Sequence, residues 1–297
     1  MDASYNTTFV TACYNCNKES DFFLNRYLRK AMRTLLIPCP LVVFCEATSA
    51  PIFRTVRDLF GLGPITHVIE QPLEDLFFYK YAPLLTKRGE TSETNYTKIT
   101  HCVMLNKFKF LLDAIAENRF GTSHVGWIDC NLLDKTFNDS INYMDTDIYN
   151  KILHICRNPK PRFSIEVINH WTPSRYANLD RFYSSYPWIV AGCFLTTETA
   201  IGTTVCTALL NKAIELTTKG YGSGEENVYA YVIDDHPDLF NLSIGDYQDT
   251  IHNYYGVTKN HKYVNWVLNM WAHSGRHAIY DQLVRYIQQA PNAPTIK

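Results

Sequence analysis

Ser123-His124-Val125-Gly126-Trp127-Ile128-Asp129-Cys130-Asn131 is a short apolar run that ends in an Asp-x-Asn pair. A strand buried on both faces has this pattern, and its first polar side chains come at the carboxyl end, where open α/β sheets bind ligands. Strand side chains repeat every two residues, so Asp129 and Asn131 are predicted to point the same way. Two oxygen donors there suit a hard divalent cation, which can in turn hold a diphosphate. A turn or a helix cap is the plainer interpretation of the same pair.

Segments typical of strands and helices alternate on both sides of this run, which predicts a mainly parallel sheet covered by helices. In the N-terminal half we expect strands at 8–13, 41–45, 66–70 and 123–131, and helices at 21–36, 52–60 and 103–118. In the C-terminal half we expect strands at 163–168, 188–196 and 239–244, and helices at 197–218, 225–233 and 261–289. The last helix carries a predicted break at Ser274-Gly275.

Composition and charge exclude several classes of protein. The chain has 297 residues, 46% of them hydrophobic, which is enough for one large α/β domain or two tightly fused halves. Its 28 basic and 29 acidic residues nearly cancel, which argues against binding nucleic acid through phosphate neutralisation. No apolar run approaches the roughly 20 residues needed to cross a bilayer, and no charged-then-apolar segment opens the chain. We therefore expect no nucleic-acid partner and no membrane span.

The nine cysteines bear on the compartment. Their number is odd, and they lie in apolar segments such as Val43-Phe44-Cys45 and Gly192-Cys193-Phe194. This pattern is typical of buried free thiols in a reducing compartment, so we expect a cytoplasmic protein.

Several short blocks with the character of a known family follow one another along the chain. They are Thr11-Ala12-x-Tyr14, Pro40-Leu41-Val42-Val43-Phe44, Asn106-Lys107-Phe108, Trp127-Ile128-Asp129, Ala191-Gly192-x-Phe194, Glu225-Glu226-Asn227, Gly245-Asp246-Tyr247 and Asn253-Tyr254. In this arrangement the chain resembles the HtrL/YibB family, whose members look like glycosyltransferases of the GT-A type. The resemblance covers about residues 7 to 255. It departs from the broader GT-A pattern at Asn131, where an acid is more usual.

The resemblance implies a single GT-A-like, Rossmann-like α/β domain with a mixed sheet flanked by helices. A nucleotide-sugar donor, with UDP favoured, would bind the half at about 1–135, and a glycan or other hydroxyl acceptor would bind the half at about 136–297. The implied cofactor is Mn2+ or Mg2+. The candidate donor-binding residues are Thr11, Ala12, Tyr14, Glu46, Arg54, Lys107, Asp129 and Gly192. Arg54, Arg57 and Lys107 are the cations near the predicted site, although a solvated helix face explains the two arginines equally well.

The catalytic candidates are carboxylates. Glu225 and Glu226 follow a glycine-rich loop at a predicted helix start, where the helix dipole favours the ionised form. Either is a candidate general base toward the acceptor hydroxyl if the anomeric configuration inverts, and Asp75 is the alternative. The candidate metal ligands are Asp129, Asn131 and His252. His252 is preferred to His273 and His277 because those two histidines belong to the final predicted helix.

Two other functions compete with sugar transfer. A nucleotide-sugar hydrolase or pyrophosphorylase could use a similar sheet, but a pyrophosphorylase should have a glycine-rich basic loop after the first strand. The segment Tyr14-Asn15-Cys16-Asn17-Lys18-Glu19 contains no glycine. A non-catalytic glycan-binding protein is suggested by 20 Tyr, 16 Phe and 5 Trp, yet most of these fall at spacings typical of a core.

Overall fold

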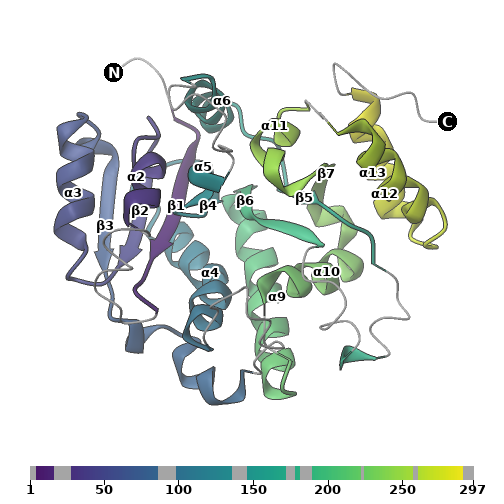
Figure 1. Ribbon diagram of the computed structural model, residues 1–297, viewed down its shortest axis with the longest axis horizontal. Helices are drawn as coiled ribbons and strands as arrows, with labels where there is room; N and C mark the ends of the chain where they lie inside the picture. The colour runs from purple at the N-terminus through teal and green to yellow at the C-terminus, as the bar shows by residue number, and fades with distance from the viewer. Residues whose placement is uncertain are drawn as a thin grey trace.

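A seven-stranded sheet crosses the molecule, with helices on both faces (Figure 1). The computed structural model describes residues 5–16, 28–85, 98–135, 146–171, 178–180, 189–221, 224–256 and 260–289. The strands are β1 (Thr7–Cys13), β2 (Leu41–Cys45), β3 (Thr66–Glu70), β4 (His124–Ile128), β5 (Phe163–Val167), β6 (Val190–Glu198) and β7 (Phe240–Ile244). Their order in the sheet is β3-β2-β1-β4-β6-β5-β7. The predicted fold class, α/β with a mixed sheet flanked by helices, is confirmed.

The direction of the strands decides which ends meet. β1 pairs in parallel with β2 and β4, β2 with β3, and β5 with β7, whereas β6 is antiparallel to both β4 and β5. The carboxyl ends of six strands therefore share one edge of the sheet, and the amino end of β6 lies among them. Open α/β sheets bind ligands at this edge.

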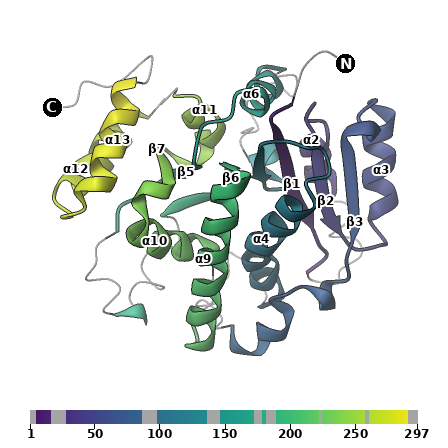
Figure 2. The same ribbon diagram turned by 180° about the vertical axis from the view of Figure 1, so that it is seen from behind.

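The helices divide between the two faces of the sheet, as Figure 2 shows from behind. One apolar core receives residues of α4 (Lys98–Glu117), α9 (Thr199–Thr218), α10 (Glu225–Asp235), α12 (His261–Ala272) and α13 (His277–Gln289). The other receives residues of α2 (Arg29–Leu35), α3 (Ala50–Leu59), α5 (Leu132–Lys135), α6 (Thr146–Arg157) and α11 (Thr250–Tyr254). Short 3-10 helices complete the described elements: η2 (Gly63–Ile65), η3 (Leu73–Asp75), η4 (Tyr79–Leu84), η5 (Pro237–Leu239) and η6 (Tyr247–Asp249).

The central strands are apolar on both faces because each face is covered. Phe9 of β1 points into one core and its neighbour Val10 into the other. Gly126 leaves room in β4 for this packing, since a Cβ there would lie 2.7 Å from the Phe9 ring and 2.9 Å from the Leu195 carbonyl oxygen. The continuous apolar runs of the sequence thus correspond to strands buried on both sides.

Most predicted elements are found within a few residues of their expected ends. The predicted break in the last helix is confirmed, because α12 ends at Ala272 and α13 begins at His277. Helix α4 begins at Lys98, earlier than expected, and the predicted start of the helix at 21–36 lies outside the described residues. Of the helices in the described ranges, none combines the length and hydropathy that a bilayer span requires.

Candidate functional site at the carboxyl end of β4

Asp129 is the first residue after β4 and still belongs to the ladder of the sheet. Its backbone N–H donates to the carbonyl oxygen of Cys193 in β6 at 2.9 Å. The chain then turns, because the N–H of Leu132 donates to the carbonyl oxygen of Asp129 at 2.9 Å and α5 begins there. Asn131 therefore lies in a turn and not on a strand. The expectation that strand periodicity aligns Asp129 with Asn131 is wrong, because the strand has already ended.

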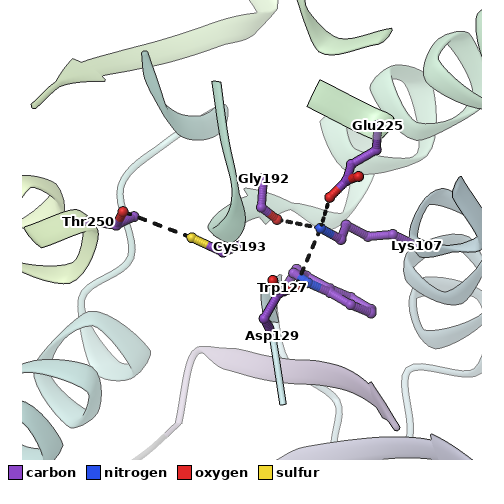
Figure 3. A network of polar contacts seen from close by, with 7 residues as sticks. All are labelled: Lys107, Trp127, Asp129, Gly192, Cys193, Glu225 and Thr250. Atoms are coloured by element: carbon purple, nitrogen blue, oxygen red, sulfur yellow. Dashed lines mark hydrogen bonds and ion pairs between the residues drawn. The ribbon is translucent and has the colours of Figure 1, made fainter. Parts of the chain in front are cut away.

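A buried ammonium group lies beside Asp129. Lys107 of α4 is 2% exposed, and its Nζ donates to the Gly192 carbonyl oxygen at 2.6 Å and to Glu225 Oε1 at 2.7 Å (Figure 3). The Asp129 Oδ1 atom lies 3.5 Å from the same nitrogen. Burial alone would lower the pKa of Lys107, but the charges of Asp129 and Glu225 together outweigh it and raise this pKa. Lys107 is therefore a charged group that already donates two hydrogen bonds to protein oxygens, with a third oxygen, Asp129 Oδ1, nearby.

Asp129 is the solvent-facing member of this cluster. Its side chain is 25% exposed, compared with 2% for Lys107 and 5% for Glu225. The indole Nε1–H of Trp127 donates to Asp129 Oδ1 at 2.6 Å, and the Lys107 ammonium lies 5.1 Å from the centroid of the Trp127 ring. The Trp127 hydrogen bond and the 3.5 Å approach of Lys107 Nζ both fall on Oδ1, so the carboxylate is held through one oxygen.

The absence of a side chain at Gly192 lets other groups approach β6. A Cβ there would lie 3.2 Å from Glu225 Oε1 and 3.2 Å from a ring carbon of Tyr229. A close approach was the reason for selecting this glycine from the sequence. In the structure the approaching groups are Lys107, Glu225 and Tyr229, and a role in ligand binding stays a prediction.

The two acids that begin α10 have different surroundings. Both are buried, and Glu225 bonds to Lys107 through Oε1. In the described part of the chain, Glu225 Oε2 has no hydrogen-bond partner. Glu226 lies near Tyr247 of η6. The pKa of the Tyr247 hydroxyl is raised, first by burial and then by the nearby groups Cys193, Asp129 and Glu226. Asp129 and Glu226 therefore both lie close enough to Tyr247 for their charges to act on its hydroxyl.

Tyr247 was not among the site residues predicted from the sequence. A signal was present, because Gly245-Asp246-Tyr247 directly follows the last predicted strand. That strand ends at the same edge of the sheet as β4, so the residues after it also belong to the candidate site.

The candidate donor-binding residues near β1 and β2 are mostly buried. Thr11, Ala12 and Tyr14 all lie in the interior, and the Tyr14 ring stacks on Phe110 with centroids 6.0 Å apart. Glu46 accepts a hydrogen bond at Oε2 from the Asn15 backbone N–H at 3.2 Å. Contacts between these residues and a nucleotide stay predictions.

The two arginines of α3 differ sharply. Arg57 is fully buried, and its guanidinium donates to the carbonyl oxygens of Leu35, Ile37 and Cys39 at 2.6–2.9 Å. Both interpretations of Arg57, a diphosphate contact and a solvated helix face, are wrong, because the side chain holds together the segment that leads into β2. Arg54 is half-exposed and forms an ion pair with Glu70 at 2.6 Å.

The remaining candidates lie on separate elements. His252 is on α11, with Nδ1 3.7 Å from Asp249 Oδ1, and Asp75 ends η3, which follows β3. Among the described residues, no group of three or more His, Cys, Asp or Glu side chains is arranged to hold a metal ion. A divalent cation held at Asp129 therefore stays a prediction.

Comparisons with known proteins find structural likeness at low sequence identity. No protein-family model matches the sequence, and the search of curated proteins finds no match. Among solved structures, the apo form of mouse xyloside xylosyltransferase 1 is similar to this chain with a TM-score of 0.42 and 11% sequence identity. The similarity covers 80% of this chain and 84% of that one.

Proposed function

We propose that the protein is a GT-A-like glycosyltransferase that moves a sugar from a nucleotide diphosphate sugar, with UDP favoured, to a glycan or other hydroxyl acceptor. The observation that carries the proposal is Asp129, a partly exposed carboxylate at the ligand-binding edge of the sheet, held by one oxygen beside a buried lysine. The resemblance to the HtrL/YibB family supports the same reaction class. In this proposal the donor binds the half at about 1–135 and the acceptor the half at about 136–297.

A divalent cation, Mn2+ or Mg2+, is part of the proposal. Asp129 would hold it, with Asn131 and His252 as the further candidates, and when bound it would stabilise negative charge on the departing diphosphate. Trp127 orients the carboxylate by its hydrogen bond to Oδ1. Lys107 places positive charge behind the carboxylate. Because its N–H groups bond to protein oxygens, it acts on the nucleotide sugar only through Asp129.

The proton of the acceptor hydroxyl goes to a carboxylate at the start of α10. Glu225 is bonded to Lys107, so Glu226 is the better candidate of the pair, and Asp75 remains the alternative. Glu226 and Asp129 both act on Tyr247, and we propose that donor and acceptor meet near these three residues.

The cysteines support a reducing compartment. All nine are free, and eight of them are buried. A cytoplasmic location is therefore part of the proposal.

Calorimetric titration with UDP, with and without Mn2+, tests the cation. Mn2+ should tighten UDP binding to the wild type by at least about tenfold and leave Asp129→Ala unaffected, because the cation bridges the carboxylate and the diphosphate. Glu215→Ala, which removes an exposed carboxylate from α9 away from the site, is the control and should behave as the wild type. Equal, metal-independent affinity in the wild type and in Asp129→Ala would refute the metal assignment. Asn131→Asp should keep or tighten metal binding, because it adds a second acid.

Turnover of single amide variants separates the candidate bases. Glu226→Gln should lose on the order of 100- to 10,000-fold in turnover with donor affinity nearly unchanged, because a general base acts mainly in the transition state. Glu225→Gln and Asp75→Asn are measured alongside. If both Glu→Gln enzymes keep near-normal turnover while Asp75→Asn loses it, the base lies after β3.

A further inference from the structure

One ammonium group faces two carboxylates, and it is bound unequally by them. Lys107 Nζ lies 2.7 Å from Glu225 Oε1, a close ion pair, and 3.5 Å from Asp129 Oδ1, beyond good hydrogen-bond distance. Its other short contact is the Gly192 carbonyl oxygen at 2.6 Å. Glu225 therefore holds the ammonium group by a direct hydrogen bond, whereas Asp129 lies beside the same group without one.

The charge that remains belongs to Asp129. One lysine and two carboxylates sum to a formal charge of −1, and the member that reaches solvent is Asp129, at 25% exposure. Glu225, at 5%, is enclosed behind the lysine. Attraction between charges strengthens steeply as water is excluded, so the position of the buried ammonium decides how strongly Asp129 attracts a cation.

We propose that Glu225 is a positioning residue that holds Lys107 away from Asp129 and so leaves the Asp129 charge available to a divalent cation. The inference rests on the proposed function for the identity of that ligand. It gives Glu225 a role different from that of a general base, because its partner is the ammonium group and not the acceptor hydroxyl.

Loss of the Glu225 charge should have a definite structural result. A buried ammonium needs a carboxylate partner, and in Glu225→Gln the nearest one is Asp129 Oδ1. Lys107 should move toward it and form the close ion pair that Glu225 formed before. Asp129 would then be neutralised by the protein itself, and its attraction for a cation would fall.

The indole N–H of Trp127 reports this movement without any ligand, because it bonds to the same Oδ1 atom and its ring lies under the ammonium. The measurement is an NMR spectrum of protein labelled with 15N at tryptophan. The indole signal that is missing from the spectrum of Trp127→Phe is that of Trp127. Glu225→Gln should shift that signal, whereas Glu226→Gln, which changes the next residue of the same helix start, should leave it nearly in place. An unshifted Trp127 signal in Glu225→Gln would overturn the inference, whatever the metal binding.

Mn2+ titration by calorimetry then tests the consequence in a double-mutant design. Glu225→Gln should weaken Mn2+ binding by roughly tenfold or more, because the lysine neutralises Asp129. Lys107→Met combined with Glu225→Gln removes the competing cation and should restore binding to within about threefold of the wild type. If the double variant binds no better than Glu225→Gln, the inference fails and Glu225 acts on the cation directly.

Two further outcomes are distinguishable. If Glu225→Gln does not fold, Glu225→Asp takes its place, because the shorter carboxylate should loosen the Lys107 ion pair, shift the Trp127 signal and weaken Mn2+ binding, and Lys107→Met should again restore it. If the wild type binds no Mn2+ with or without UDP, the metal in the proposed function fails. The Trp127 signal in the unliganded variants still tells whether Glu225 controls the position of Lys107.

Discussion

Glu166 is a second buried carboxyl near the ligand-binding edge, separate from the Lys107 cluster. It lies on β5, is 2% exposed, and accepts a hydrogen bond at Oε1 from Asn253 Nδ2 at 2.6 Å. Burial raises its pKa to about 8, against hydrogen bonds from Thr250 and Asn253 that lower it, and nearby Asp246 and Asp249 raise it further. The neutral acid is therefore the form that the folded protein prefers at neutral pH.

This preference predicts a pH dependence of stability. A carboxyl with a raised pKa contributes stability that is complete below about pH 4.5, its ordinary pKa, and is lost as the pH rises to about 8. Glu166→Gln keeps the shape of the neutral acid and cannot ionise. Its unfolding free energy, measured in urea from pH 5 to 8, should rise relative to that of the wild type as the pH increases. Parallel curves for the two proteins would contradict the burial of a titrating acid.

At the scale of residues, the sequence indicates individual members of the site but not their partners. Asp129, Lys107, Glu225 and Gly192 could each be selected because acids at element ends, a lysine before the β4 run and a strand glycine are local signals. The bond between Lys107 and Glu225 joins residues 118 apart, and no local pattern indicates which carboxylate meets a buried ammonium. Arg57 shows the same limit, because its carbonyl partners lie at the end of α2 and in the loop after it, 18–22 residues away.

At the scale of elements, the strands were predictable because they are buried on both faces and form unbroken apolar runs. The antiparallel direction of β6 was not, because an apolar run carries no sign of its direction. The end of β4 was also misjudged: Asp129 still bonds to β6, but the chain turns within the next two residues. A polar pair at the end of an apolar run is compatible both with a strand that continues and with a turn.

The packing of β4 leads to a stability prediction. Gly126→Ala should destabilise the protein by about 1–3 kcal/mol, because the added Cβ would meet the Phe9 ring and the Leu195 carbonyl inside the sheet. Gly63→Ala is the control, since its Cβ would meet mainly the exposed side chain of Asp58, which can move away. Urea denaturation of both variants measures the difference. Equal losses of stability in the two variants would mean that a Cβ fits at position 126 without a clash.

At the scale of the whole molecule, the single sheet joins the two halves of the sequence. β4 from the first half pairs with β6 from the second, and each of the two apolar cores contains residues from both. We therefore expect one cooperative unfolding transition. The indole signals of Trp127 and Trp271, one from each half, should disappear at the same urea concentration. Two separate midpoints would show that the halves fold as independent units.

The outer edge of the sheet has a consequence for behaviour at high protein concentration. β3 ends the strand order, and within the described part of the chain no strand pairs with its outer side, where a strand could be added. At its end Glu70 pairs with Arg54 of α3. Within the strand, His67 lies 3.1 Å from Glu117 of α4. Exposed ion pairs contribute little to folding, but charges that must be stripped of water oppose the addition of a second chain. We therefore expect these charges to oppose self-association through β3.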